Sequence, residues 1–161
     1  MSARKITKPP TAFDLAHRPG FLIRRLHQIH TALFIEECAE FNVTPVQYSV
    51  MTAIVEQSAL EQARLAQEVG VDRATLANVL ARLEARGLLR RVTTKTDRRL
   101  KRVILTVKGK RLLSQMTQAA RRAHERTIEA LPPVQRAAFL QALAQLVDAG
   151  NDFGRAPLRL A

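Results

Sequence analysis

The sequence predicts a mainly α-helical protein that carries one small β-hairpin. Apolar residues recur at helical spacing from residue 21 onward, and two β-prone runs, Leu88–Thr93 and Lys101–Thr106, flank a polar, basic turn. Proline or glycine marks most of the expected boundaries. With 161 residues, of which 47% are hydrophobic, the chain is long enough for one compact domain or one subunit of a small oligomer.

The first half of the chain is expected to hold an arm and two helices. Residues 1–20 contain three prolines and no periodicity, which predicts an arm or loop. Residues 21–41 carry two adjacent apolar stripes, so this helix is expected to be buried on more than one side. Thr44-Pro45 is typical of a helix N-cap followed by proline at the first helical position, and predicts a helix to about Glu56.

The second half predicts a helical pair, a hairpin and two more helices. A short helix from about Glu61 to Val69 is followed by a turn at Gly70 and a helix from Asp72 to Arg86, which Gly87 ends. The hairpin follows. Thr106 then caps a helix from Val107 to about Ala130, and Pro132-Pro133 opens a last helix to about Ala149, ahead of a tail at 151–161.

Composition excludes several classes of protein. No apolar run is long enough to span a bilayer, and the N-terminus lacks the apolar core of a secretion signal, so a cytoplasmic protein without a membrane partner is expected. A single cysteine, Cys38, rules out an intramolecular disulfide framework and a cysteine-rich zinc cluster. Aromatic residues make up only 4%, which argues against stacking on single-stranded nucleic acid.

The positive charge is concentrated in one quarter of the chain. Thirteen basic residues and only two acidic ones lie between Arg73 and Arg111, which accounts for nearly all of the net charge of +12. Clustered charge of one sign repels itself, whereas a surface that binds phosphates needs it because phosphate contacts release counterions. This segment is therefore the predicted nucleic-acid surface, and double-stranded DNA is the predicted partner.

The same segment has the spacing of a helix-turn-helix. Ala66 supplies a small contact between the helices, Gly70 the turn and Val71 an apolar plug, while buried positions are expected at Leu76, Val79, Leu80 and Leu83. The outward face of the second helix then carries Arg73, Thr75, Asn78 and Arg82 among three alanines. Arginine pairs with guanine edges and asparagine with adenine, so these four are candidate DNA-binding residues.

The hairpin extends this unit into a winged helix-turn-helix. Its tip carries Lys95, Arg98, Arg99, Lys101 and Arg102, and the negative potential of a narrow minor groove attracts such side chains. The first four of these residues complete the candidate DNA-binding set. Asp97 lies among them and is expected to orient an arginine through a bidentate pair.

The stretch from Leu22 to Leu113 resembles the MarR (multiple antibiotic resistance regulator) family of bacterial transcription factors. The resemblance rests on LAQEVGVDRATLANVLARLEARGLLRR, then on Asp97-x-Arg99 with Leu105-Thr106-x-x-Gly109. It implies a homodimer in which residues 21–43 and 107–150 form the dimerisation region and residues 44–106 the DNA-binding lobe. It also implies that Arg99 enters the minor groove and that Thr75, Asn78 and Arg82 read bases. The apolar residues of the long helix, from Leu112 to Ile128, exceed what one chain is expected to bury.

Family resemblance also implies release from DNA by a small aromatic compound, and FLIRRLHQIHTALF resembles the branch that controls breakdown of benzoates, hydroxycinnamates and nicotinate derivatives. Histidines on an apolar stripe must find hydrogen bonds. With cations, donors and apolar walls nearby, an aromatic carboxylate would be well matched. The candidate effector-binding residues are His17, Arg18, Arg24, His27, His30, Tyr48 and Met51.

Other functions are weighed against this interpretation. The histidines could instead be satisfied by backbone carbonyls or lie in a dimer contact, and metal sensing lacks a third ligand at suitable spacing. Thiol sensing by Cys38 is disfavoured because neighbouring glutamates would raise the pKa of the thiol. An architectural DNA-binding protein without an effector is the alternative from another class. No enzyme motif, phosphate loop or cofactor site is present, so an enzyme is not predicted.

Overall fold

The computed structural model describes residues 14–57, 60–93 and 101–154. Its elements, in chain order, are η1 (Leu15–His17), α1 (Pro19–Glu37), η2 (Ala39–Phe41), α2 (Pro45–Glu56), β1 (Leu60–Glu61), α3 (Gln62–Glu68), α4 (Arg73–Ala85), β2 (Leu89–Thr93), β3 (Lys101–Leu105), α5 (Val107–Ile128), α6 (Pro133–Ala149) and η3 (Asn151–Phe153). The predicted class, mainly α with a small hairpin, is confirmed. No helix in these ranges is both long and apolar enough to cross a bilayer.

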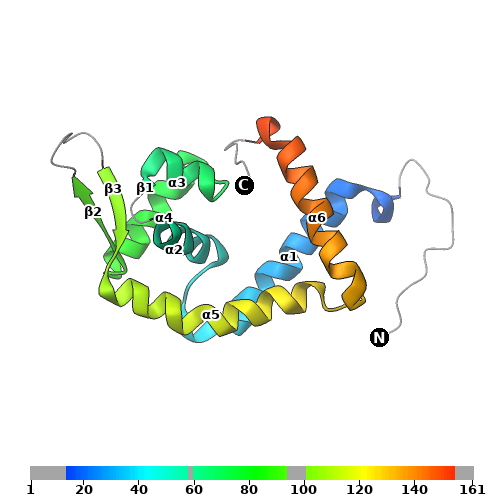
Figure 1. Cartoon of the computed structure of the whole chain (residues 1–161), viewed down its shortest axis with the longest axis horizontal. Helices are drawn as coiled ribbons and strands as arrows, with labels where there is room; N and C mark the ends of the chain where they lie inside the picture. The colour runs from blue at the N-terminus through cyan, green and yellow to red at the C-terminus, as the bar shows by residue number, and fades with distance from the viewer. Residues whose placement is uncertain (1–13, 58–59, 94–100, 155–161) are drawn as a thin grey trace.

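The long helix α5 connects two differently built parts (Figure 1). A lobe made of α2, α3, α4 and the small sheet lies at one end of α5, and α6 rises at the other end (Figure 1). Helix α1 crosses α5 and packs along it. The chain thus enters the lobe after α1 and leaves it along α5, which packs against α1.

Side-chain caps set the helix starts where the sequence predicted them. The Thr44 hydroxyl accepts a hydrogen bond from the backbone N–H of Gln47, whose side chain accepts one from Thr44 N–H in return, forming a capping box. Asp72 accepts from the N–H of Thr75 at 2.8 Å, and Thr106 accepts at the start of α5 in the same way. Each cap satisfies a backbone donor that the first helical turn leaves without a partner.

Two glycines adopt the left-handed conformation at the predicted turns. Gly70, between α3 and α4, has φ of +66°, and Gly87, directly after α4, has φ of +68°. Both conformations are costly for residues with a Cβ. The first helix, by contrast, is shorter than predicted: α1 ends at Glu37, and the separate turn η2 precedes Asn42, itself left-handed at φ of 49°.

The sheet has one strand more than predicted. β2 and β3 form the expected antiparallel hairpin, with Leu89 opposite Leu105 and Thr93 opposite Lys101. The two-residue strand β1 pairs with the other edge of β3, so the order is β1-β3-β2. Two residues are too few to show the alternation that reveals a strand, so the sequence places Glu61 in the following helix. In the structure Glu61 belongs to β1, and the helix begins at Gln62.

The core is divided between the lobe and the helical part. In the lobe the buried side chains include the predicted Ala66, Leu76, Leu80 and Leu83, with Val71 and Val79 packed against them. A second cluster lies between α1 and α5 and contains Phe34, Cys38, Val43, Met116, Ala119, Ala120 and Ala123. Small alanines on α5 allow α1 to approach closely, which brings Phe34 to 1% exposure.

The expectation that one chain cannot bury the apolar stripe of the long helix is met only in part. Met116, Ala119, Ala120 and Ala123 are all buried within this chain, because Phe34 and Cys38 of α1 cover them. Leu112, Leu113 and Ile128 are only half-buried, and more uncovered apolar surface lies on other helices. On α1, Leu22, Ile23 and Ile29 are about half exposed, and none of the residues of α6, all of which are described, is buried.

Candidate nucleic-acid interface and effector pocket

The outward face of α4 carries exposed polar side chains, most of which have no internal partner among the described residues. Its three buried leucines face the lobe core, which directs Arg73, Thr75, Asn78 and Arg82 outward, and all four are exposed. Within the described residues, the side chains of Arg73, Asn78 and Arg82 make no hydrogen bond or ion pair, so they can contact a partner without breaking internal bonds. The Thr75 hydroxyl donates to Asp72 at 3.0 Å, which leaves its oxygen as an acceptor.

The base of the wing is described and its tip is not. Arg90 and Arg102 are exposed on β2 and β3, and Arg91 forms a 3.4 Å ion pair with Glu84 of α4. Lys95, Asp97, Arg98 and Arg99 lie outside the described residues. Lys101 opens β3 opposite Thr93, but its side chain is also outside the description. The structure therefore brings α4 and the two wing strands to the same lobe and leaves the predicted roles of the tip residues as predictions.

A bonded joint that sequence reasoning missed connects the lobe to the helical part. The guanidinium of Arg86, at the end of α4, donates to the backbone carbonyls of Asn42 and Phe41 in the loop before α2. The Lys108 ammonium donates to the Arg86 carbonyl at 2.8 Å, and the Thr106 hydroxyl donates to the Gly87 carbonyl at 2.7 Å. The segment before α2 and the start of α5 are thus both hydrogen-bonded to the residues at the end of α4.

His30 forms the centre of a small aromatic group between α1 and α5. Its ring stacks on that of His124 with centroids 5.2 Å apart, and Phe34 lies 6.2 Å from His30 and 5.5 Å from Tyr48. The Nδ1 atom lies 2.9 Å from the hydroxyl oxygen of Thr127. Because that hydroxyl donates its proton to the Ala123 carbonyl, Nδ1 of His30 is the donor, which assigns the neutral ring a lone pair on Nε2.

Burial, with contributions from His124 and His27, holds the pKa of His30 below its ordinary value of 6.5. His30 is therefore neutral at pH 7. It also lines a pocket of about 340 Å³ between α1, α5 and α6, together with His124 and Thr127. The other walls are mainly apolar, and include Leu26, Ile128, Phe139 and Leu143. Glu125, which pairs with Arg121, also lines the pocket. A neutral imidazole among apolar walls suits a ligand that offers a hydroxyl or ring N–H.

Of the predicted effector set, only His30 lines this pocket. Tyr48 contacts the aromatic group through Phe34 without lining the pocket, and His27 lies one turn before His30 on an exposed part of α1. The other four candidates are elsewhere in a single chain: His17 bonds to Asp14 at 2.7 Å, Arg18 precedes α1, Arg24 lies over the Phe21 ring, and Met51 is wholly buried in the lobe core. Sequence reasoning missed His124 and Thr127, because each lies singly on a polar part of α5.

Four charged side chains clamp α1 to α5 beside this group. Arg122 donates to Glu37 at 2.7 Å, and Arg126 donates to Glu37 at 2.7 Å and to Glu36 at 3.0 Å. The hydrogen bonds from Arg122 and Arg126 hold the pKa of Glu37 below its usual value. Burial, reinforced by Glu37, raises the pKa of the Cys38 thiol, which agrees with a packing role and disfavours thiol sensing. Among the described residues no three metal-binding side chains gather.

Comparison with known proteins identifies the family. Residues 43–101, which span the lobe from the end of η2 to the start of β3, match the MarR family. Over 144 residues the chain is 31% identical to the HTH-type transcriptional repressor NicR of Pseudomonas putida, a match that covers 89% of this chain and 91% of NicR. The chain belongs to the MarR family.

Two solved MarR-family structures show the same arrangement. BpsR of Bordetella bronchiseptica, described with regulation of its DNA binding by 6-hydroxynicotinic acid, is 31% identical and superposes with a TM-score of 0.80 over 87% of this chain and 99% of BpsR. PcaV of Streptomyces coelicolor, in complex with its natural ligand, is 33% identical with a TM-score of 0.77 over 88% of this chain and 99% of PcaV. The described lobe, helices and hairpin are thus those of MarR-family regulators.

Proposed function

We propose that this MarR-family chain is a ligand-responsive transcriptional regulator that binds operator DNA as a homodimer and is released by a small aromatic acid. The observation that carries the proposal is the exposed face of α4, where Arg73, Asn78 and Arg82 have no partner among the described residues. It lies beside a basic wing, in a chain whose relatives include a repressor and a regulator whose DNA binding is regulated by 6-hydroxynicotinic acid. It acts on DNA rather than as an enzyme, and it works in the cytoplasm.

The DNA-reading roles follow from position. Arg73, Thr75, Asn78 and Arg82 enter the major groove on α4, and Lys95, Arg98, Arg99 and Lys101 of the wing contact the neighbouring minor groove. Residues 44–106 form the DNA-binding lobe of each subunit. Two lobes related by a two-fold axis would read half-sites about one helical turn apart.

The dimer surface is the uncovered apolar face of the helical part. Leu22, Ile23 and Ile29 of α1 and Leu140 and Leu146 of α6 are between 48% and 66% exposed in one chain. Apolar surface of this extent, carried by the two outer helices, marks a protein interface. Residues 21–43 and 107–150 therefore supply the dimerisation region, with α1 and α6 facing the second copy.

The effector pocket is the one that His30 lines. The Nε2 lone pair of neutral His30 accepts a hydrogen bond from a ring hydroxyl or N–H of the ligand, and Phe139 and Leu143 contact its apolar body. The carboxylate needs a cation, which Arg18 or Arg24 of the second copy supplies across the dimer. Release follows if the ligand prefers a dimer whose lobes are spaced wrongly for successive major grooves.

A gel-shift titration against the promoter beside its own gene tests this function. We expect the protein to form a discrete complex with this DNA. The complex should dissociate when 6-hydroxynicotinic, benzoic or hydroxycinnamic acid is added. Complete DNA occupancy throughout this panel would reject the ligand-released form of the proposal. An architectural DNA-binding protein, the alternative function, would bind all sequences alike with affinity governed by salt.

A further inference from the structure

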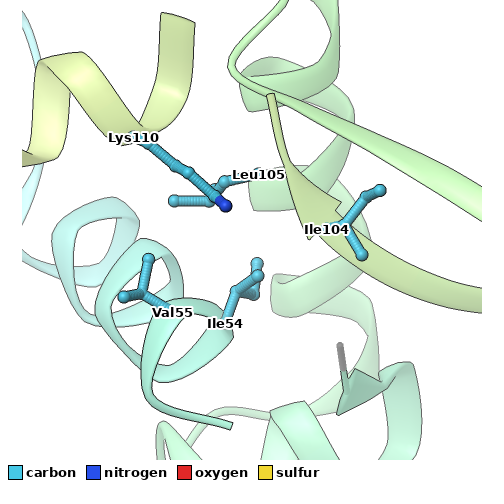
Figure 2. Close-up of a pocket in the computed structure, with 5 residues that line it drawn as sticks. All are labelled: Ile54, Val55, Ile104, Leu105 and Lys110. Carbon is cyan, nitrogen blue, oxygen red and sulfur yellow. The ribbon is translucent and has the colours of Figure 1, made fainter. Parts of the chain in front are cut away.

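A second pocket lies in the lobe, at the junction of three elements. It has a volume of about 260 Å³ and is lined by Ile54 and Val55 of α2, Ile104 and Leu105 of β3, and Lys110 in the first turn of α5. Figure 2 shows the Lys110 side chain reaching from α5 across the pocket, with its nitrogen near Leu105 and above the two α2 residues. None of these residues lines the pocket at His30.

The lining combines an aliphatic surface with one uncommitted cation. Ile54 and Leu105 are 3% and 6% exposed and form the floor, while Val55 at the rim is 45% exposed. Within the described residues, the Lys110 ammonium has no hydrogen-bond or ion-pair partner, whereas Lys108 two residues earlier donates to the Arg86 carbonyl. Lys110 itself is exposed, and the lining offers its ammonium no acceptor side chain, so an anionic ligand in the pocket could pair with it without displacing an internal bond.

Size and wall chemistry define the class of ligand. The volume is below the 300 to 1,000 Å³ of roughly drug-sized sites, so only a compact molecule fits. Four aliphatic walls favour an apolar body over a polar anion such as inorganic phosphate, because apolar surface gains free energy when it is removed from water. We propose that this pocket binds a small carboxylate with a compact apolar body, whose carboxylate pairs with Lys110.

Occupancy of this pocket would act on the wing. Leu105 ends β3, and the adjoining Thr106 attaches the start of α5 to Gly87 at the end of α4. A ligand that bridges α2 to this junction holds the wing strand and the first turn of α5 together. The pocket would therefore be a second small-molecule site within the lobe, separate from the effector pocket proposed above.

Methyl NMR of the full-length protein separates the two pockets. With isoleucine δ1 methyl groups labelled, Ile54 and Ile104 report on the lobe pocket and Ile128 on the pocket at His30. Titration with cyclohexanecarboxylate is expected to shift the Ile54 and Ile104 signals saturably. The uncharged cyclohexanecarboxamide should bind at least about tenfold more weakly there, because it lacks the charge that Lys110 pairs with.

Two variants test the role of the ammonium. Lys110→Met is expected to weaken cyclohexanecarboxylate binding, read at Ile54 and Ile104, by about tenfold or more, and Lys110→Arg to retain it. Arg111→Met removes the same charge one residue later, from a side chain that does not line the pocket, and should leave the affinity unchanged.

The proposal would be overturned if the Ile54 and Ile104 signals did not move or did not saturate. It would also be overturned if Lys110→Met and Arg111→Met weakened binding equally. A response of Ile128 alone would overturn it while leaving the effector pocket standing.

Discussion

The guanidinium of Arg86 donates a 2.9 Å hydrogen bond to the backbone carbonyl of Phe41, and so joins the end of α4 to the turn that follows α1. The same guanidinium also donates to the Asn42 carbonyl, where the backbone is left-handed. These two hydrogen bonds directly connect the segment that follows α1 to the end of α4.

Arg86→Met should lower the free energy of unfolding by about 1–3 kcal/mol, because two charge-assisted hydrogen bonds are lost. The stability of Arg86→Lys should lie between that of the unaltered protein and that of Arg86→Met, since an ammonium lacks the planar guanidinium that bonds both carbonyls at once. Urea unfolding measures both. Arg64→Met is the matched control: its 3.4 Å pair with Glu68 is exposed and is worth less than about 1 kcal/mol. Equal losses from the two methionine variants would contradict a special role for Arg86.

Gly109→Ala should destabilise the protein by about 1–3 kcal/mol or more. A Cβ at residue 109 would collide with the carbonyl of Leu88, a backbone group that cannot move aside alone. Gly20→Ala is the control, because nothing lies within 4 Å of its added Cβ, and alanine in α1 should leave stability unchanged or raise it by up to about 1 kcal/mol. Thermal unfolding of the two variants side by side decides the matter, and similar melting temperatures would refute the close packing of α5 on Leu88.

Asn78→Ala and Arg82→Ala should each weaken binding to the operator by about one to two orders of magnitude, with little effect on unrelated duplexes. Both side chains are exposed on α4 and have no internal partner within the described residues. Arg121→Ala, which removes a charge from α5 where Arg121 bonds to Gln118 and Glu125, should leave operator affinity nearly unchanged. Fluorescence anisotropy at fixed salt gives the three affinities. A uniform loss on every duplex would favour the architectural alternative.

Stability should fall as the pH drops below about 6.5, and His30 should be one cause. The fold holds the pKa of His30 below that of the unfolded chain, so the unfolded state binds more protons in this range. The contribution of His30 to stability is complete above the unfolded pKa of 6.5, and it is lost as the pH falls from 6.5 through the lower pKa of the folded state. Glu37, whose pKa is also lowered, loses its contribution in a separate range below 4.5.

Urea midpoints at pH 7.5 and pH 5.5 test the His30 contribution. His30→Gln keeps a polar group near Thr127 but cannot titrate, so its midpoint should depend less on pH than that of the unaltered protein. An identical pH dependence in both proteins would remove His30 from the explanation.

Local chemistry made much of the fold predictable. Thr44, Asp72 and Thr106 cap the helices that they were expected to cap, and Gly70 and Gly87 turn the chain, because caps and left-handed turns depend on neighbouring residues alone. Contacts between distant segments were not predictable in the same way. The sequence shows Arg86 only as one of many basic residues, because the carbonyls that it bonds lie more than forty positions earlier in the chain.

The candidate effector site shows the same division. The apolar stripe on α1 indicated His30, but its partners His124 and Thr127 come from α5, and their approach depends on how alanines let the two helices pack. The predicted Met51 is taken up by the lobe core, because a periodic apolar position does not reveal which neighbour covers it. The exposure of the candidates on α4 was predicted correctly, since the helical period separates buried from exposed positions, whereas their role in reading DNA stays a prediction.

Sedimentation of the protein with a fluorescent duplex from the region beside its gene tests the central claim most directly. We expect two chains per duplex, a preference over a scrambled duplex of equal length, and loss of the complex when 6-hydroxynicotinic acid or a related aromatic acid is added. A monomer that leaves the duplex unbound at low ionic strength would contradict the account.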